Sequence, residues 1–140
     1  MRAILSTILL VMACGGSGGS GSSPRALQTE KSEAPRGAQI YASECANCHG
    51  DRGEGAGRAP AVMGPGSLPL TGAGRSEFVT ARDLFDYLES TMPLPKRRAG
   101  SLSDADYWAV TSYLLESNGI EIPRAGLGES NAKELRITGN

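Results

Sequence analysis

The sequence predicts an all-α domain of about three helices over residues 37–122. Three observations support this prediction. Apolar residues recur at helical spacing in two long segments. No stretch alternates between apolar and polar residues as a half-buried strand does. Finally, only 5% of the 140 residues are aromatic and 19 are glycine, so a core built from side chains alone would be thin.

The first predicted helix covers residues 37–46, "GAQIYASECA", with Ile40 and Tyr41 as its apolar contacts. Residues 50–74 are rich in Gly and Pro, and we expect neither helix nor strand there. The second helix covers residues 76–90, "SEFVTARDLFDYLES", with Ser76 as its N-cap. The apolar face of this second helix consists of Phe78, Ala81, Leu84, Phe85 and Leu88.

The third predicted helix has the clearest signals at both ends. Ser103 and Asp106 approximate a capping box at its start, and Asn118-Gly119 ends it. Its apolar face consists of Tyr107, Val110, Thr111, Leu114 and Leu115. Residues 123–140 follow as a C-terminal tail, an extended coil that either lies on the domain or hangs loose.

The N-terminus has the pattern of an export signal. A basic start and the apolar run "AILSTILLVMA" predict a signal peptide over residues 1–13, which is too short to span a bilayer. "VMAC" resembles a bacterial lipobox, which implies a lipidated Cys14; the alternative is an ordinary signal peptide with a stray cysteine. Residues 14–36, with "GGSGGSGSSP", predict a flexible tether. We expect a lipid-anchored domain on the periplasmic side of a bacterial membrane, and the absence of Asp after Cys14 favours the outer membrane.

The segment "CANCH" places Cys45, Cys48 and the chain's only histidine, His49, within five positions. The spacing C-x-x-C-H is the attachment signature of a c-type haem, in which both thiols bond the porphyrin and the histidine ligates the iron. A structural zinc site needs four ligands, and the only other cysteine is Cys14. A thioredoxin-like dithiol would begin a helix after a strand, and a disulfide would leave His49 unexplained. The motif therefore predicts one covalent haem c.

A single histidine excludes bis-histidine ligation, which leaves Met, Lys, water or an open site opposite His49. After removal of the signal peptide, Met63 and Met92 remain. Met63 lies only 14 residues after His49, so the chain would have to pass round the haem edge in a very short loop, and we expect Met63 to serve packing or to lie at the surface. Met92 lies 43 residues after His49, where Pro93 and Pro95 stiffen the backbone. We therefore expect Met92 as the second axial ligand; a thioether raises the potential and suits electron transfer.

Three motifs together, "YASECANCHG", "YLESTMPLP" and "GSLSDADYWAVTSYLLESNG", make residues 37–122 resemble a class I cytochrome c of the bacterial periplasmic type. The resemblance implies a cytochrome c-like fold around the haem, in which Gly37 and Tyr41 of the first helix lie near Tyr113 and Leu114 of the third. It also implies that the carbonyl of Pro60 accepts a hydrogen bond from the ring of His49 and orients it.

These observations predict a membrane-tethered, mono-haem electron carrier that is not an enzyme and has no small-molecule substrate. The resemblance implies redox partner proteins, such as a dehydrogenase, an oxidase or a respiratory complex. Lys96-Arg97-Arg98 would dock an acidic partner or form a solvated loop. The balance of 14 Lys and Arg against 15 Asp and Glu gives no nucleic-acid footprint.

Two other functions remain open. A haem sensor or a peroxidase-like enzyme would need a displaceable sixth ligand, together with an acid or base above the iron, and no second histidine exists to supply it. A subunit that relays electrons only inside a fixed complex is the other alternative.

Overall fold

The computed structural model describes residues 34–65, 67–68 and 78–137. The predicted signal peptide, Cys14, most of the tether and Ser76 lie outside these residues. Within them the chain is helical and forms no strand, which confirms the all-α prediction, and no helix is long and apolar enough to cross a membrane. The helices in chain order are α1 (Ala34–Ile40), a π-helical turn (Tyr41–Cys45), α2 (Ala46–His49), α3 (Ala81–Thr91), a 3-10 turn (Lys96–Arg98) and α4 (Asp104–Ser117).

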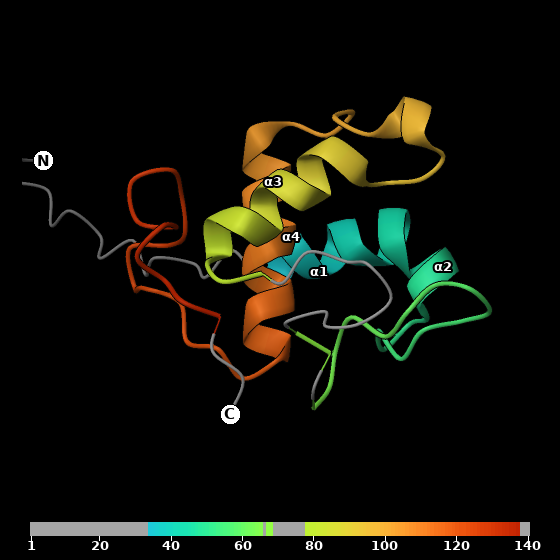
Figure 1. The fold of residues 1–140 in the computed structure, drawn as a ribbon, viewed down its shortest axis with the longest axis horizontal. Helices are drawn as coiled ribbons and strands as arrows, with labels where there is room; N and C mark the ends of the chain where they lie inside the picture. Colours follow the sequence, from blue (N-terminus) through green and yellow to red (C-terminus); the bar gives the residue numbers. More distant parts are fainter. Residues whose placement is uncertain (1–33, 66, 69–77, 138–140) are drawn as a thin grey trace, which may run out of the picture.

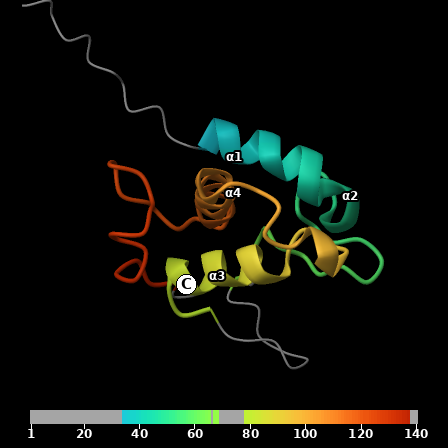
Figure 2. The same cartoon turned by 90° about the horizontal axis from the view of Figure 1, so that it is seen from above.

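Helix α4 lies between α1 and α3 and crosses both of them (Figures 1 and 2). Because it has neighbours on two sides, it is buried around most of its circumference. Its buried residues are Tyr107, Ala109, Val110, Thr111, Ser112, Leu114 and Leu115. The predicted cap is confirmed: the Ser103 side chain accepts a hydrogen bond from the Asp106 amide, and the helix ends at Asn118.

Helix α1 crosses α4 at Gly37, where the two backbones come very close. A Cβ added at this glycine would lie 2.6 Å from the Cβ of Tyr113 and 2.9 Å from the carbonyl carbon of Ala109. One turn later, the rings of Tyr41 and Tyr113 pack with their centroids 5.7 Å apart. The expected approach of Gly37 and Tyr41 to the last helix is therefore confirmed.

The first helical segment is longer than predicted. It runs from residue 34 to 49 instead of 37 to 46, so the whole C-x-x-C-H motif is helical and forms the end of the segment, where it was expected. The segment stops at Gly50, whose φ of +83° suits glycine. The hydroxyl of the buried Tyr41 donates to the Gly50 carbonyl at 2.7 Å and fixes this end of the segment.

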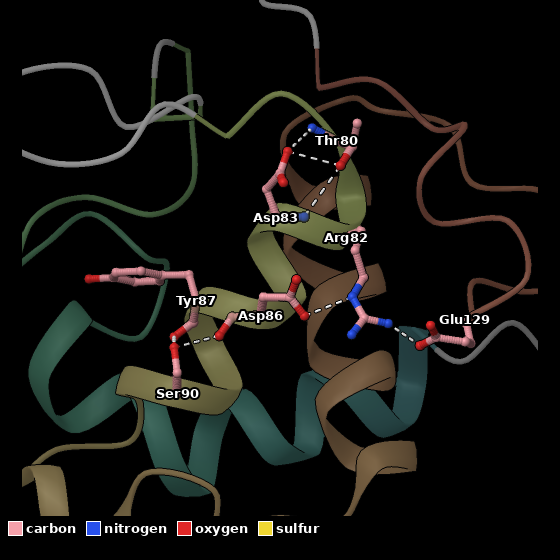
Figure 3. Close-up of polar contacts among 7 residues, drawn as sticks. All are labelled: Thr80, Arg82, Asp83, Asp86, Tyr87, Ser90 and Glu129. Atoms are coloured by element: carbon pink, nitrogen blue, oxygen red, sulfur yellow. Dashed lines mark hydrogen bonds and ion pairs between the residues drawn. The ribbon is translucent and has the colours of Figure 1, made fainter.

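Helix α3 begins later than predicted, at Ala81, because Thr80 forms the N-cap. The Thr80 side chain accepts a hydrogen bond from the Asp83 amide, and the Asp83 carboxylate accepts from the Thr80 amide at 2.8 Å, a capping box visible in Figure 3. The amide of Val79 also donates to Asp83. These bonds hold the backbone before Ala81 in an extended form, so the helical prediction for residues 78–80 is wrong.

The C-terminal segment lies on the domain through residue 137, which is the first of the two alternatives expected for the tail. Its apolar side chains Leu127, Ala132 and Ile137 belong to the core. The Leu135 carbonyl accepts from the Ala81 amide at 2.8 Å, so the segment gives a partner to a free N–H in the first turn of α3. Arg82, which also pairs with Asp86 of the same helix, adds a further tie to the segment through its ion pair with Glu129 (Figure 3).

The C-terminal segment lies at the opposite end of the helices from α2 (Figures 1 and 2). It therefore closes the core on the side away from the end that carries the C-x-x-C-H motif.

Candidate functional site

The residues predicted as functional surround two hollows that share Cys48, Met92 and Leu94. The inner hollow is also lined by Tyr41, Glu44, Cys45 and His49, and its remaining walls are aliphatic: Val62, Leu88, Pro93 and Leu114. The outer hollow has a volume of about 620 Å³ and is bordered by Asn47, residues 56–60 and Tyr87. A site of this size with apolar walls and a few polar groups suits a bound small molecule or cofactor.

His49 is held by the loop that follows it. Its Nδ1 lies 2.9 Å from the carbonyl oxygen of Pro60. Because a carbonyl only accepts hydrogen bonds, we infer that the proton is on Nδ1, which leaves the lone pair of Nε2 free for a metal. The loop returns to His49 through bonds from the Gly55 amide to the His49 carbonyl at 2.7 Å and from the Val62 amide to the Gly53 carbonyl at 2.8 Å.

The end of α4 secures the same loop. The Asn118 side-chain amide donates to the carbonyls of Val62 and Leu114, at 2.9 Å and 2.7 Å. The sequence analysis treated Asn118 only as a helix stop. Its second role depends on a contact between residues 56 positions apart, for which the local sequence gives no signal.

The two motif cysteines have different surroundings. Cys48 is exposed, whereas Cys45 is partly buried. Burial, with smaller contributions from the charges of Glu44 and Cys48, raises the pKa of the Cys45 thiol to about 11. A redox-active dithiol needs a lowered thiol pKa, so this environment opposes the thioredoxin-like alternative. Among the described residues, no three His, Cys, Asp or Glu side chains gather as a structural zinc site requires.

Met92 lies at the C-cap of α3 and borders the same cavity as the motif. Its amide donates to the Leu88 carbonyl at 2.8 Å, and its side chain lines both hollows together with Cys48. Met63 does not line either hollow and packs against the core instead. The structure thus brings Cys45, Cys48, His49 and Met92 to one cavity.

The residues around the two adjoining hollows suit haem c. Two thiols, an imidazole and a thioether line the inner hollow together with aliphatic side chains, and the outer hollow, of about 620 Å³, adjoins it at Cys48, Met92 and Leu94. When bound, haem c supplies an iron that alternates between Fe(II) and Fe(III). The protein would hold it by the thiols of Cys45 and Cys48, orient His49 through the Pro60 carbonyl, and keep water away with the aliphatic walls.

Comparison with known proteins gives a family and similar proteins. A family model described as cytochrome c matches residues 34–118. Thiosulfate dehydrogenase from Stutzerimonas stutzeri (strain A1501) is 38% identical over 110 residues, which cover 75% of this chain and 34% of that protein. The crystal structure of the sulfane dehydrogenase SoxCD from Paracoccus pantotrophus matches with a TM-score of 0.59 and 30% identity, covering 76% of this chain and 53% of that chain.

This chain therefore spans about a third of the length of the curated relative and about half of the solved chain. The helical arrangement found here is shared with the sulfane dehydrogenase over three quarters of the present chain.

One expectation needs correction. The sequence analysis excluded an enzyme, but both related proteins are named as dehydrogenases, which points to an enzyme-associated function. The physical reason for the error is that C-x-x-C-H and Met92 identify a cofactor and its ligands. The same kind of haem domain serves a free carrier and a dehydrogenase equally well, so these residues do not tell the two apart.

Proposed function

The chain belongs to the cytochrome c family and carries covalent haem c, and from that premise we propose that it transfers electrons for a dehydrogenase of reduced sulfur compounds, with His49 and Met92 as its axial ligands. One observation carries the ligand assignment: His49 and Met92 line the same cavity, which they share with Cys45 and Cys48. With both axial positions filled, an electron can be exchanged with little change in ligation.

The residues of the site suit this role. The Pro60 carbonyl orients His49, and the aliphatic walls lower the local dielectric constant around the metal. Exposure of Cys48 and of Leu94, which is 57% exposed, leaves one edge of the cavity close to the surface. That edge is where an electron would enter or leave.

The relation to the two dehydrogenases supports a donor that oxidises a reduced sulfur compound. The site that binds such a compound can lie in this chain or in a partner. We also propose that Cys14 carries a lipid and that the tether keeps the domain on the periplasmic side of the membrane, which the lipobox-like "VMAC" and the Gly/Ser-rich segment support.

The experiment that tests this function is the optical spectrum of the haem-loaded full chain. The oxidised protein should be low-spin and show the weak charge-transfer band of a Met–Fe(III) bond, and the reduced protein should resist carbon monoxide. A high-spin spectrum or ready binding of carbon monoxide would contradict the proposal and favour the sensor or peroxidase-like alternative.

A second prediction concerns the surface beside this exposed edge. Lys96 and Arg97 are exposed and make no ion pair among the described residues, whereas Arg98 pairs with Glu44 at 2.5 Å. Because they follow Leu94 closely, their charges should attract an anionic partner. Exchanging Lys96 and Arg97 for Glu together should slow oxidation of the reduced protein by ferricyanide about tenfold at low salt.

The matched control places the same charge change at Arg124 and Lys133, which are exposed on the C-terminal segment at the far end of the molecule. That variant should react at nearly the native rate, and high salt should remove the difference between the two. Equal rates for both variants would show that Lys96 and Arg97 play no steering role.

A further inference from the structure

Tyr107 is a buried residue of α4 that stands close to the predicted haem ligand. Its side chain is 1% exposed. Its ring packs edge-on against Phe85 of α3, with the centroids 6.1 Å apart. The sequence analysis assigned this residue only to the apolar face of the helix. A leucine or phenylalanine would serve that purpose, so the hydroxyl needs a separate explanation.

The hydroxyl of Tyr107 is fully bonded. It donates to the carbonyl of Met92 at 2.8 Å and accepts from the amide of Gly100 at 2.9 Å. Met92 begins the segment that connects α3 to α4, and Gly100, later in the same segment, turns the chain with a φ of +71°. One oxygen therefore ties two points of this connection, eight residues apart, to the helix that follows it.

These contacts hold the backbone of Met92 on both sides. Its amide donates to Leu88 at 2.8 Å, as the last bond of α3, and its carbonyl accepts from Tyr107. The Met92 side chain therefore lines the cavity from a backbone held by two hydrogen bonds. The ring of Pro93 restricts the backbone at the next position. Only the side-chain torsions of Met92 are left free.

We propose that Tyr107 is a positioning residue for the axial ligand: its hydroxyl fixes the Met92 backbone so that the sulfur stays at the haem and is not displaced by other ligands. This inference rests on the proposed ligation by Met92. A fixed backbone lowers the entropy that the thioether loses on binding, which favours the bound ligand over a free competitor. A loosened connection would let the sulfur leave and open the sixth site.

Tyr107→Phe tests the proposal, because it keeps the ring and removes only the hydroxyl. The full haem-loaded chain is titrated with imidazole in the ferric state, and the Met–Fe(III) band is recorded at the same time. A net hydrogen bond is worth about 0.5–1.5 kcal/mol, so we expect the variant to bind imidazole about 2- to 13-fold more tightly and to lose the band at lower imidazole. Tyr113→Phe is the control, since the Tyr113 ring packs on Tyr41 away from the Met92 segment and should leave the affinity unchanged.

Urea unfolding of the same proteins separates positioning from stability. A variant that unfolds more easily but binds imidazole with native affinity would overturn the inference, because Tyr107 would then have a structural role alone. If the native protein shows no Met–Fe(III) band, the proposed ligation fails and this inference fails with it. If the native band is present and Tyr107→Phe changes neither the band nor the affinity, only the inference is overturned.

Discussion

Met92→Leu should abolish the Met–Fe(III) charge-transfer band and open the sixth coordination site of the haem. Leucine has nearly the volume of methionine, so the cavity wall stays filled and the change removes only the sulfur. A thioether favours Fe(II), and its loss should lower the reduction potential by on the order of 100 mV, a modest part of the ~0.8 V range that axial ligands span. Potentiometric titration of the full haem-loaded chain measures this shift.

Met63→Leu is the matched control, because Met63 packs against the core and borders neither hollow. That variant should keep the Met–Fe(III) band and the reduction potential, and its reduced form should resist carbon monoxide as the native protein does. The Met92 variant, in contrast, should bind carbon monoxide readily when reduced. A Met92→Leu protein with native spectrum and potential would show that another group ligates the iron.

The chemistry of the site could be predicted from the sequence because few residues can supply it. The chain has one histidine, and only two methionines lie beyond the predicted signal peptide. His49 and Met92 were therefore the expected axial ligands, and both border the cavity. Helix α4 was equally predictable, since Ser103 and Asp106 form its cap within four residues of sequence.

What could not be predicted depends on contacts between distant residues. The sequence analysis placed the N-cap of the second helix at Ser76, whereas Thr80 is the N-cap in the structure. The structure begins the helix at Ala81, whose amide bonds the carbonyl of Leu135. The tail that supplies this partner has no helical or alternating pattern of its own, so its burial was left as one of two alternatives.

The hydrogen bonds of the Tyr107 hydroxyl could not be predicted for the same reason. Its hydroxyl reaches Met92, 15 positions earlier in the chain, and periodicity shows only that the ring faces the core. The link with dehydrogenases could not be predicted, because the residues that hold the haem are of the same kind whether or not the domain serves an enzyme.

The second large effect is expected at the crossing of α1 and α4, where Gly37→Ala should destabilise the protein strongly. Helix propensity by itself would favour alanine over glycine by about 1 kcal/mol. The added methyl group, however, would lie 2.1 Å from the Ala109 carbonyl oxygen and 2.6 Å from the Tyr113 Cβ, and neither is a flexible side-chain end that can swing away. Overpacking of this kind costs about 1–3 kcal/mol and occasionally more. Because the closest contact is with a backbone atom, we expect the upper end of this range, about 3 kcal/mol, and hence a net loss of about 2 kcal/mol in the free energy of unfolding.

Urea unfolding of the haem-loaded chain measures this loss, with Gly128→Ala as the control. A Cβ at Gly128 would meet nothing within 4 Å, so its substitution should change stability by less than about 1 kcal/mol in either direction. The two variants make the same chemical change, and only the distance to a neighbouring backbone differs between them. If Gly37→Ala were as stable as the native protein, α1 and α4 would have to cross farther apart than the structure places them. The contact of Tyr41 with Tyr113, which fixes the helix that leads into the C-x-x-C-H motif, would then need a different explanation.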